Sequence, residues 1–409
     1  MGTKLAISTA PTIIANWNRR VATQWERAPA GVRDNARLLA GLALLLGVWR
    51  MAILALSLIW SRVGVRFPWP DEYAGMRLWR FSIRWDAEWY LQIAQHGYTH
   101  TDGAQSSVAF FPGFPLAIRL FDALLPGGGA FAGLAVVHLA LIAALVYVYL
   151  LARLDFSDRV AWWTIGFMLM FPAAFYYSAI YPQSLLLLGI AGALYHARRG
   201  QWWFAGTFGF LAGATSLAGL VVVIPLGIEL RRWGARHQIR PQDVVAVALS
   251  PLGGIAYFAY LWSEFGSPRV IMDSLKAWDA GTSSALLWSR LEYLRWNPVP
   301  MVLIGGRQLG LRDDFVALEL TLICAFLSAG AYLCWKVRPS YGVLVIGMTL
   351  VPMLVGTRLG IGGHVAVLFP AFILLARIAH DGMRMTLSII FTLGLTLTTF
   401  LFVHGFWAG

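Results

Sequence analysis

The stretch from residue 84 to residue 115 is the only long polar and aromatic segment in an otherwise hydrophobic chain. It places a carboxylate, Asp86, directly after Trp85 and shortly after a long apolar run. A carboxylate held among aromatic side chains near lipid is costly unless it is paired or performs chemistry. Asp86 could begin a helix or pair with Arg84, but a surface ion pair contributes little stability. The pattern therefore favours a functional role for Asp86, and proton transfer is the chemistry open to a carboxylate.

The remaining candidates for chemistry are weaker. His96, His100 and Asp102 are metal-ligand types within one segment, but such a cluster in a loop is more often solvated than metal-bound. Cys324 and Cys334 have neither metal nor disulfide spacing. The sequence also lacks a glycine-rich phosphate loop and the HExxH and GxSxG motifs. We therefore predict neither a metal nor a cofactor.

Helical spacing predicts how Asp86 is positioned. Residues 84–96 fit a helix that lies along the membrane surface, with Gly97 at its end. Tyr90 follows Asp86 on one stripe, and the neighbouring stripe holds aromatic residues typical of membrane anchors, Trp85 and Trp89. We expect Asp86 to lie beside this aromatic anchor.

Composition defines the class of protein. The 409 residues are 58% hydrophobic and only 13% charged, and apolar runs long enough to cross a bilayer recur along the chain. Backbone groups in lipid must bond within their own segment, so we predict an all-α, polytopic integral membrane protein. The net charge of +12 could indicate a nucleic-acid partner, but the basic residues form short clusters between spans. Such clusters mark cytoplasmic loops, and we expect no nucleic acid.

One threading keeps every basic loop in the cytoplasm. It has about eleven transmembrane helices and a single domain, 38–409, with outer segments at 61–127 and 263–313. Residues 1–37 form a cytoplasmic segment that can include an interfacial helix, and no cleavable signal peptide is expected. The expected spans are 38–60, 128–151, 160–176, 183–197, 202–214, 216–230, 243–262, 314–335, 341–356, 364–379 and 386–405.

The motif around Asp86 resembles the first outer loop of the PIG-V-like mannosyltransferases, WDAEWYLQIAQHGY followed by AFFPGFP. Shorter similarities follow along most of the chain, at 181–185, 213–219, 265–278 and 369–372, but only the first motif is specific. Three positions depart from the pattern: Gln183 replaces a glutamate, Ser216 or Leu217 an arginine, and 363–364 an Arg-Tyr pair. This chain thus resembles a divergent member of that family.

The resemblance implies a GT-C-like fold and an inverting glycosyltransferase, with mannose as the expected kind of sugar. The donor would be a polyprenyl-phosphate sugar, and the acceptor a hydroxyl of a membrane lipid or glycan. Asp86 would be the catalytic base that takes the acceptor proton. Cations would stabilise the leaving phosphate, with Arg358 and His364 as first candidates. The substrate-binding candidates are Arg84, Tyr90, His96, Tyr98, Gln183, Arg269, Lys276, Arg358 and His364.

Two other functions remain open. Arg50, a charge within a span, favours a transporter or flippase for a lipid-linked substrate. The departures at 183, 216–217 and 363–364 are also compatible with a catalytically silent partner of another glycosyltransferase. The compact loops favour a bacterial plasma membrane protein, and the charge map predicts an active site on its extracytoplasmic face. The sugar, the acceptor and the linkage do not follow from the sequence.

Overall fold

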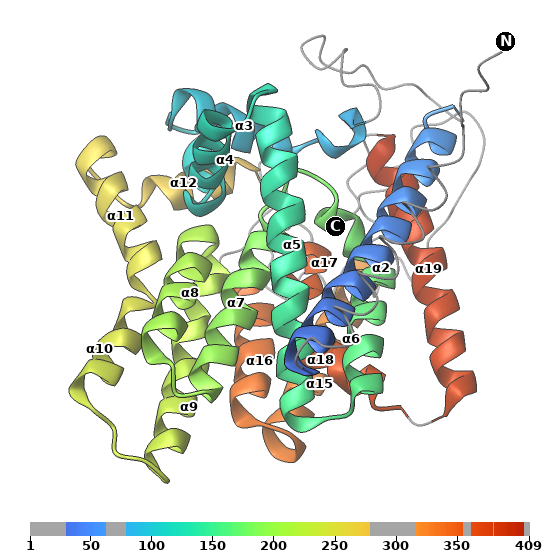
Figure 1. Ribbon diagram of the computed structural model, residues 1–409. Helices are drawn as coiled ribbons and strands as arrows, with labels where there is room; N and C mark the ends of the chain where they lie inside the picture. The colour runs from blue at the N-terminus through green and yellow to red at the C-terminus, as the bar shows by residue number, and fades with distance from the viewer. Residues whose placement is uncertain (1–29, 63–78, 279–315, 355–360, 379, 405–409) are drawn as a thin grey trace, which may run out of the picture. The chain divides into compact units, whose positions relative to one another are not determined.

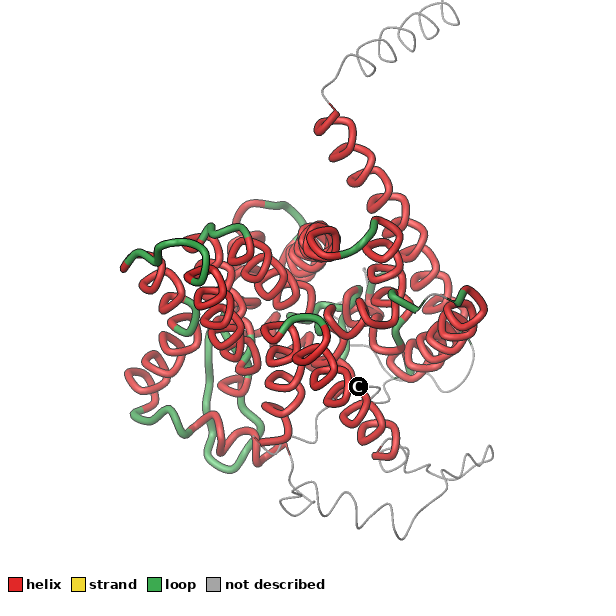
Figure 2. The backbone as a smooth tube through the Cα atoms, turned by 90° about the horizontal axis from the view of Figure 1, so that it is seen from below, coloured by secondary structure: helices red, strands yellow, loops and turns green. Residues whose placement is uncertain are grey.

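A computed structural model describes residues 30–62, 79–278, 316–354, 361–378 and 380–404. These residues form helices joined by loops, with no strand among them (Figure 2). The chain divides into two units, residues 1–48 and residues 49–409. The described residues of the first unit, 30–48, all belong to α2 (Ala30–Trp60), and the rest of this helix belongs to the second unit. The predicted interfacial helix before residue 30 lies outside the described residues.

Three described helices are long and apolar enough to cross a bilayer: α2, α5 (Gly128–Asp155) and α19 (Asp381–Val403). A fourth candidate is the pair α10 (Pro241–Leu249) and α11 (Leu252–Phe265), which is bent by 52°. An all-helical membrane protein is thus confirmed for the described residues. The number of about eleven spans stays a prediction, because many of the other expected spans correspond to shorter helices.

Proline explains most of the interruptions in the expected spans. The span expected at 160–176 divides into α6 (Asp158–Met170) and η4, which begins at Pro172. Pro251 separates α10 from α11, and Pro370 stands near the start of α18. Proline has no N–H to donate and its ring obstructs the preceding turn, so a continuous helix ends before it.

The centre of the second unit is built on α7 (Gln183–Arg198), which packs against α5 and α8 (Trp202–Thr215). A Cβ atom at Gly189 would lie only 2.8 Å from the backbone nitrogen of Ala212. This contact between α7 and α8 therefore depends on a residue without a side chain, as is common where membrane helices approach closely.

The remaining helices complete the second unit. Their bounds are η2 (Arg80–Ser82), α3 (Asp86–His96), η3 (Ser107–Ala109), α4 (Gly113–Leu124), η4 (Pro172–Tyr177), η5 (Leu217–Val222), α9 (Val223–Gly234), α12 (Val270–Trp278), α15 (Val316–Lys336), α16 (Pro339–Leu354), α17 (Ile361–Ala366) and α18 (Phe369–Ala376).

Within the second unit, α3, α4 and α12 lie together at one end (Figure 1). The loops that follow α5, α9 and α15 lie at the opposite end, and ion pairs join the helices there (Figure 1). Arg198 of α7 binds Asp155 of α5 through two bonds of 2.5 and 2.6 Å, and Arg338 binds the buried Glu229 of α9 through two bonds of 2.6 Å. The basic loops and the Asp86 segment are therefore at different ends, as the predicted threading requires.

The helix that carries Asp86 agrees closely with its prediction. We expected a helix over 84–96, and α3 begins two residues later, at Asp86. It ends where expected, because Gly97 has a positive φ of 83° and donates its N–H to Ile93 O. The apolar side of α3 is buried and packs on α4 and α5, which holds the helix and its first residue in place.

Candidate active site

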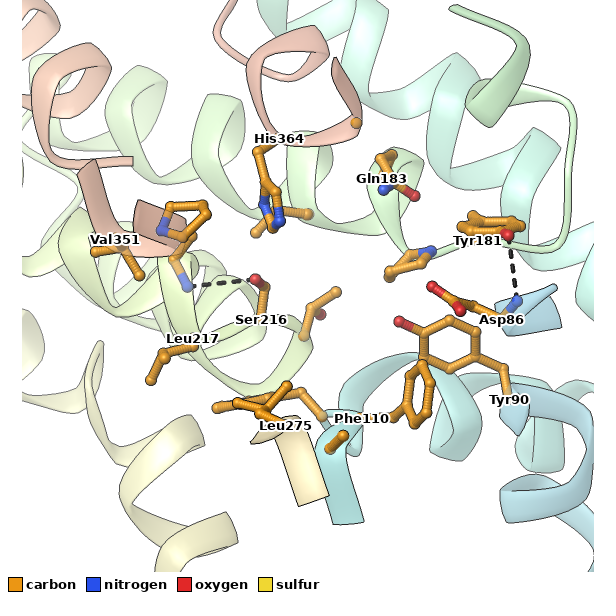
Figure 3. A pocket seen from close by; sticks show the side chains of 18 of the residues that line it. Asp86, Tyr90, Phe110, Tyr181, Gln183, Ser216, Leu217, Leu275, Val351 and His364 are labelled. Carbon is orange, nitrogen blue, oxygen red and sulfur yellow. Dashed lines mark hydrogen bonds between the residues drawn. The ribbon is translucent and has the colours of Figure 1, made fainter. Parts of the chain in front are cut away.

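A pocket lies between the helix starts of the second unit, and Asp86 forms part of its wall (Figure 3). Asp86 is the first residue of α3, Gln183 is the first residue of α7, and Ser216 directly precedes η5. His364 of α17 faces the same space from the other side (Figure 3). The pocket therefore joins polar side chains from four elements that are far apart in the sequence.

Burial alters the acidity of Asp86. The side chain is half-buried and its surroundings are largely protein, which raises the pKa of this carboxyl from 3.8 to about 7. The hydroxyl of Tyr90 lies beside the carboxylate (Figure 3), and the pKa of Tyr90 is raised by burial and then by the negative charge of Asp86. A carboxyl with a pKa near 7 is well matched to accept a proton at neutral pH.

The wall that faces Asp86 is neutral and polar. Oε1 of Gln183 is a buried acceptor with no hydrogen-bond partner within the described part of the chain. Gly363 stands against this amide, and a Cβ atom at Gly363 would lie 2.9 Å from Gln183 Nε2. A buried acceptor without a partner costs free energy unless a ligand or water donates to it, so Gln183 Oε1 is suited to a hydroxyl group.

The far part of the pocket is apolar. Its wall comes from Leu217, Val351, Pro352 and one side of α12, through Ile271 and Leu275. Two hydrogen bonds hold α12 there, because the Ser274 hydroxyl donates to the carbonyl of Ser106 and accepts from its N–H, both at 3.0 Å. The apolar residues Val108, Phe111, Tyr257, Leu261, Val270 and Ile271 pack together beside this pair. The pocket can thus hold a ligand that has both a polar and an apolar part.

Four predicted site residues meet in this pocket: Asp86, Tyr90, Gln183 and His364. Arg358, predicted to bind phosphate, lies outside the described residues. None of the described residues that line the pocket is a lysine or an arginine. Across the described ranges, no group of three or more metal-ligand side chains could hold a metal ion.

Five other predicted residues do not line the pocket. The Arg84 guanidinium donates to Val403 O at 3.4 Å, and Tyr98 donates to Phe110 O at 2.9 Å while its ring packs on Tyr257. His96 is exposed at the end of α3. Arg269 and Lys276 are exposed beside and on α12, where Lys276 pairs with Asp273 at 3.3 Å. The mid-span Arg50 also lies outside the pocket wall.

Sequence reasoning missed several wall residues. Tyr181 lies beside Asp86 and accepts a hydrogen bond from its backbone N–H at 3.2 Å (Figure 3). Tyr181 could have been found from the sequence, because it begins the 181–185 segment that resembles a family motif and contains Gln183. Ile271 and Leu275 gave no signal, because their place in the wall depends on how α12 packs against η3.

The fold and the pocket define a helical membrane protein with a half-buried carboxyl of raised pKa between its helices. Residues 57–227 match the family model described as Mannosyltransferase (PIG-V). Over that part the chain is similar to the PIG-V mannosyltransferases, which confirms the resemblance predicted from the Asp86 loop.

Individual relatives match the chain over part of its length. The chain is 32% identical to GPI alpha-1,6-mannosyltransferase 2 of Cricetulus griseus, over 34% of this chain and 30% of that protein. It is 33% identical to the protein of the same name from Rattus norvegicus, with the same coverage. The chain thus spans about a third of the length of these relatives. It is also similar to the apo oligosaccharyltransferase of Archaeoglobus fulgidus, with a TM-score of 0.41 and 13% identity over 90% of this chain and 57% of that one.

Proposed function

We propose that this protein is an integral-membrane inverting glycosyltransferase of the mannosyltransferase type with a GT-C-like fold. It moves a sugar from a polyprenyl-phosphate donor to a hydroxyl of a lipid or glycan acceptor. The observation that carries the proposal is Asp86, a half-buried carboxyl with a pKa of about 7, in a pocket with a polar and an apolar part. The match of residues 57–227 to the PIG-V model supports the same conclusion.

In the proposed reaction, the carboxylate of Asp86 takes the proton of the acceptor hydroxyl as that oxygen attacks the anomeric carbon. The bond between the anomeric carbon and the phosphate oxygen breaks, and its electrons leave with the polyprenyl phosphate. Attack on the face opposite the leaving group inverts the anomeric configuration. A base with a pKa near the working pH is ionised often enough to act and basic enough to accept the proton.

The other wall residues have proposed binding roles. Tyr90, Gln183 and His364 contact the sugar, and the buried Oε1 of Gln183 accepts a hydrogen bond from a sugar hydroxyl. The apolar part next to α12 holds the first isoprene units of the donor. Besides the acceptor, the reaction needs only the lipid-linked sugar, and we propose no metal.

The departing phosphate needs positive charge nearby. Arg358 and His364 remain our first candidates, since His364 lines the pocket and Arg358 precedes its helix, α17. Arg269 and Lys276 are the next candidates, and they would have to turn toward the pocket when the donor binds. We also propose that the site lies on the extracytoplasmic face of a bacterial plasma membrane, at the end of the bundle away from the basic loops.

The test uses purified protein, radiolabelled polyprenyl-phosphate mannose and a membrane lipid extract as the source of acceptor. We expect labelled glycolipid with the wild type and none with Asp86→Asn. Asp122→Asn is the matched control, because this carboxylate lies in the same expected outer segment and is exposed. Full transfer by Asp86→Asn would overturn the assignment of the base.

The same assay separates the competing functions. A silent partner would form no product alone in detergent. A flippase would move labelled donor across a proteoliposome membrane without forming product. No described contact favours transport, because Arg50, the mid-span charge that suggested it, donates to Ser178 O and Ser82 Oγ.

A further inference from the structure

The backbone immediately before Asp86 is strained. Trp85 has φ 55° and ψ −121°, and it is the one residue other than glycine with a positive φ in the described part of the chain. Arg84 O accepts a hydrogen bond from Ala87 N–H at 3.2 Å, so residues 84–87 form a tight turn. These dihedral angles belong to the second residue of a type II′ turn, a position that glycine normally occupies. A tryptophan there persists only when its surroundings hold it.

The Tyr181 hydroxyl connects the two sides of this turn. It accepts from Asp86 N–H at 3.2 Å (Figure 3) and donates to Arg84 O at 3.1 Å, so its two bonds flank Trp85. The Tyr181 side chain is only 2% exposed, and its ring packs on Tyr90 and Tyr176. The hydroxyl therefore has little freedom to move away from the turn.

A second set of contacts fixes the Tyr181 segment against the Asp86 segment. Ile180 N–H donates to Ser82 O at 2.9 Å, and the Ser82 hydroxyl donates to Ser178 O at 2.9 Å. The buried guanidinium of Arg50 joins both segments, with bonds of 3.2 Å to Ser178 O and 3.4 Å to Ser82 Oγ. These bonds thus hold residues 82–86 against residues 178–181 through groups that do not line the pocket.

We propose that Tyr181 is a positioning residue, whose hydroxyl holds Trp85 in its strained conformation and thereby directs the Asp86 carboxylate into the pocket. Without the hydroxyl, Trp85 can relax toward a negative φ, and the first turn of α3 then shifts relative to Gln183 and His364. The proposal deepens the proposed function and rests on it, because it assumes that Asp86 is the base.

The first test is Tyr181→Phe, assayed at varied donor concentration. We expect kcat to fall by about 10- to 100-fold, because a displacement near 1 Å of a reacting group can have an effect of this size. We expect the donor KM to change little, since the hydroxyl bonds to backbone rather than to substrate. Tyr177→Phe is the matched control: this tyrosine is also fully buried, and its hydroxyl donates to a backbone carbonyl, Ala366 O, at 2.6 Å.

The second test asks whether the hydroxyl acts through the backbone of Trp85. Glycine adopts a positive φ without strain, whereas alanine does not. Trp85→Gly should therefore restore most of the kcat lost in Tyr181→Phe, and Trp85→Ala, which removes the same side chain, should not. Trp85→Gly alone should also melt at a higher temperature than Trp85→Ala.

The outcomes separate this proposal from the proposed function. Wild-type kcat in Tyr181→Phe, or equal kcat in the glycine and alanine double variants, would overturn the positioning role while leaving Asp86 as the base. Equal loss of kcat in Tyr177→Phe and Tyr181→Phe would also overturn it, since the effect would then be loss of any buried hydroxyl. Full transfer by Asp86→Asn would instead refute the base itself.

Discussion

Replacing Asp86 with asparagine should abolish transfer and at the same time stabilise the fold at alkaline pH. Asparagine keeps the shape of the side chain and removes its charge. The folded protein disfavours that charge, because burial raises the pKa of Asp86 from 3.8 to about 7. The variant therefore loses the base and also loses the free-energy cost of a half-buried carboxylate.

The pH window follows from the direction of the shift. Between about pH 4 and pH 7 the folded state holds a proton on Asp86 that the unfolded state has released, so wild-type stability falls as the pH rises through this window. Below pH 4 the wild type and Asp86→Asn should be equally stable. Above pH 7 the variant should be more stable than the wild type by a constant amount. At about 1.4 kcal/mol per pH unit, the gain has an upper limit on the order of 4 kcal/mol, reduced by the partial exposure of the side chain.

Thermal melting of both proteins in detergent from pH 4 to pH 9 measures this difference. We expect the melting temperatures to separate between pH 4 and pH 7. The wild-type kcat/KM should rise about tenfold per pH unit up to about pH 7 and then level off, since it reports the ionised base of the free enzyme. A constant difference in melting temperature, or a rate that is flat from pH 5 to pH 8, would refute the reasoning about burial.

Three further variants test the pocket wall and the contacts that support it. Ser274→Ala removes both bonds to Ser106, which weakens the packing of α12 by about 1–2 kcal/mol and should raise the donor KM several-fold in initial-rate measurements. An unchanged KM would show that apolar contacts alone hold α12. Gly363→Ala places a Cβ 2.9 Å from Gln183 Nε2 and should lower kcat/KM with little change in melting temperature; wild-type kcat/KM would exclude the Gln183 amide from sugar binding. Arg50→Ala leaves the Ser178 carbonyl without its cationic donor and should lower the free energy of unfolding by about 2–4 kcal/mol, seen as a lower melting temperature. An unchanged melting temperature would mean that the other bonds hold the two segments together without Arg50.

Local patterns in the sequence were enough to predict the helix that carries the base. The α3 helix, its end at Gly97 and the presence of Asp86 on it follow from spacing and from residue type. The two-residue difference at its start has a physical cause, because Trp85 adopts a positive φ that no local preference of tryptophan favours. That conformation depends on Tyr181, a residue 96 positions further along the chain.

The same limit applies to the pocket. Gln183 and His364 could be named as candidates, because a family motif or an unusual polar residue marked each position. The apolar wall could not be predicted, since Ile271 and Leu275 differ from other apolar residues only through the packing of α12. Arg269 and Lys276 illustrate the reverse case, in which charge drew attention to residues that the helix keeps exposed.

The spread of the pocket along the chain has a consequence for biosynthesis. Its walls begin at Asp86 and are closed by His364, so a ribosome must add most of the polypeptide before the site exists. A nascent chain that ends after α12 lacks the part of the pocket wall that Val351, Pro352, Gly363 and His364 supply. A truncated product ending before α17 would therefore lack Gly363 and His364, and under the proposed function we expect it to transfer no sugar.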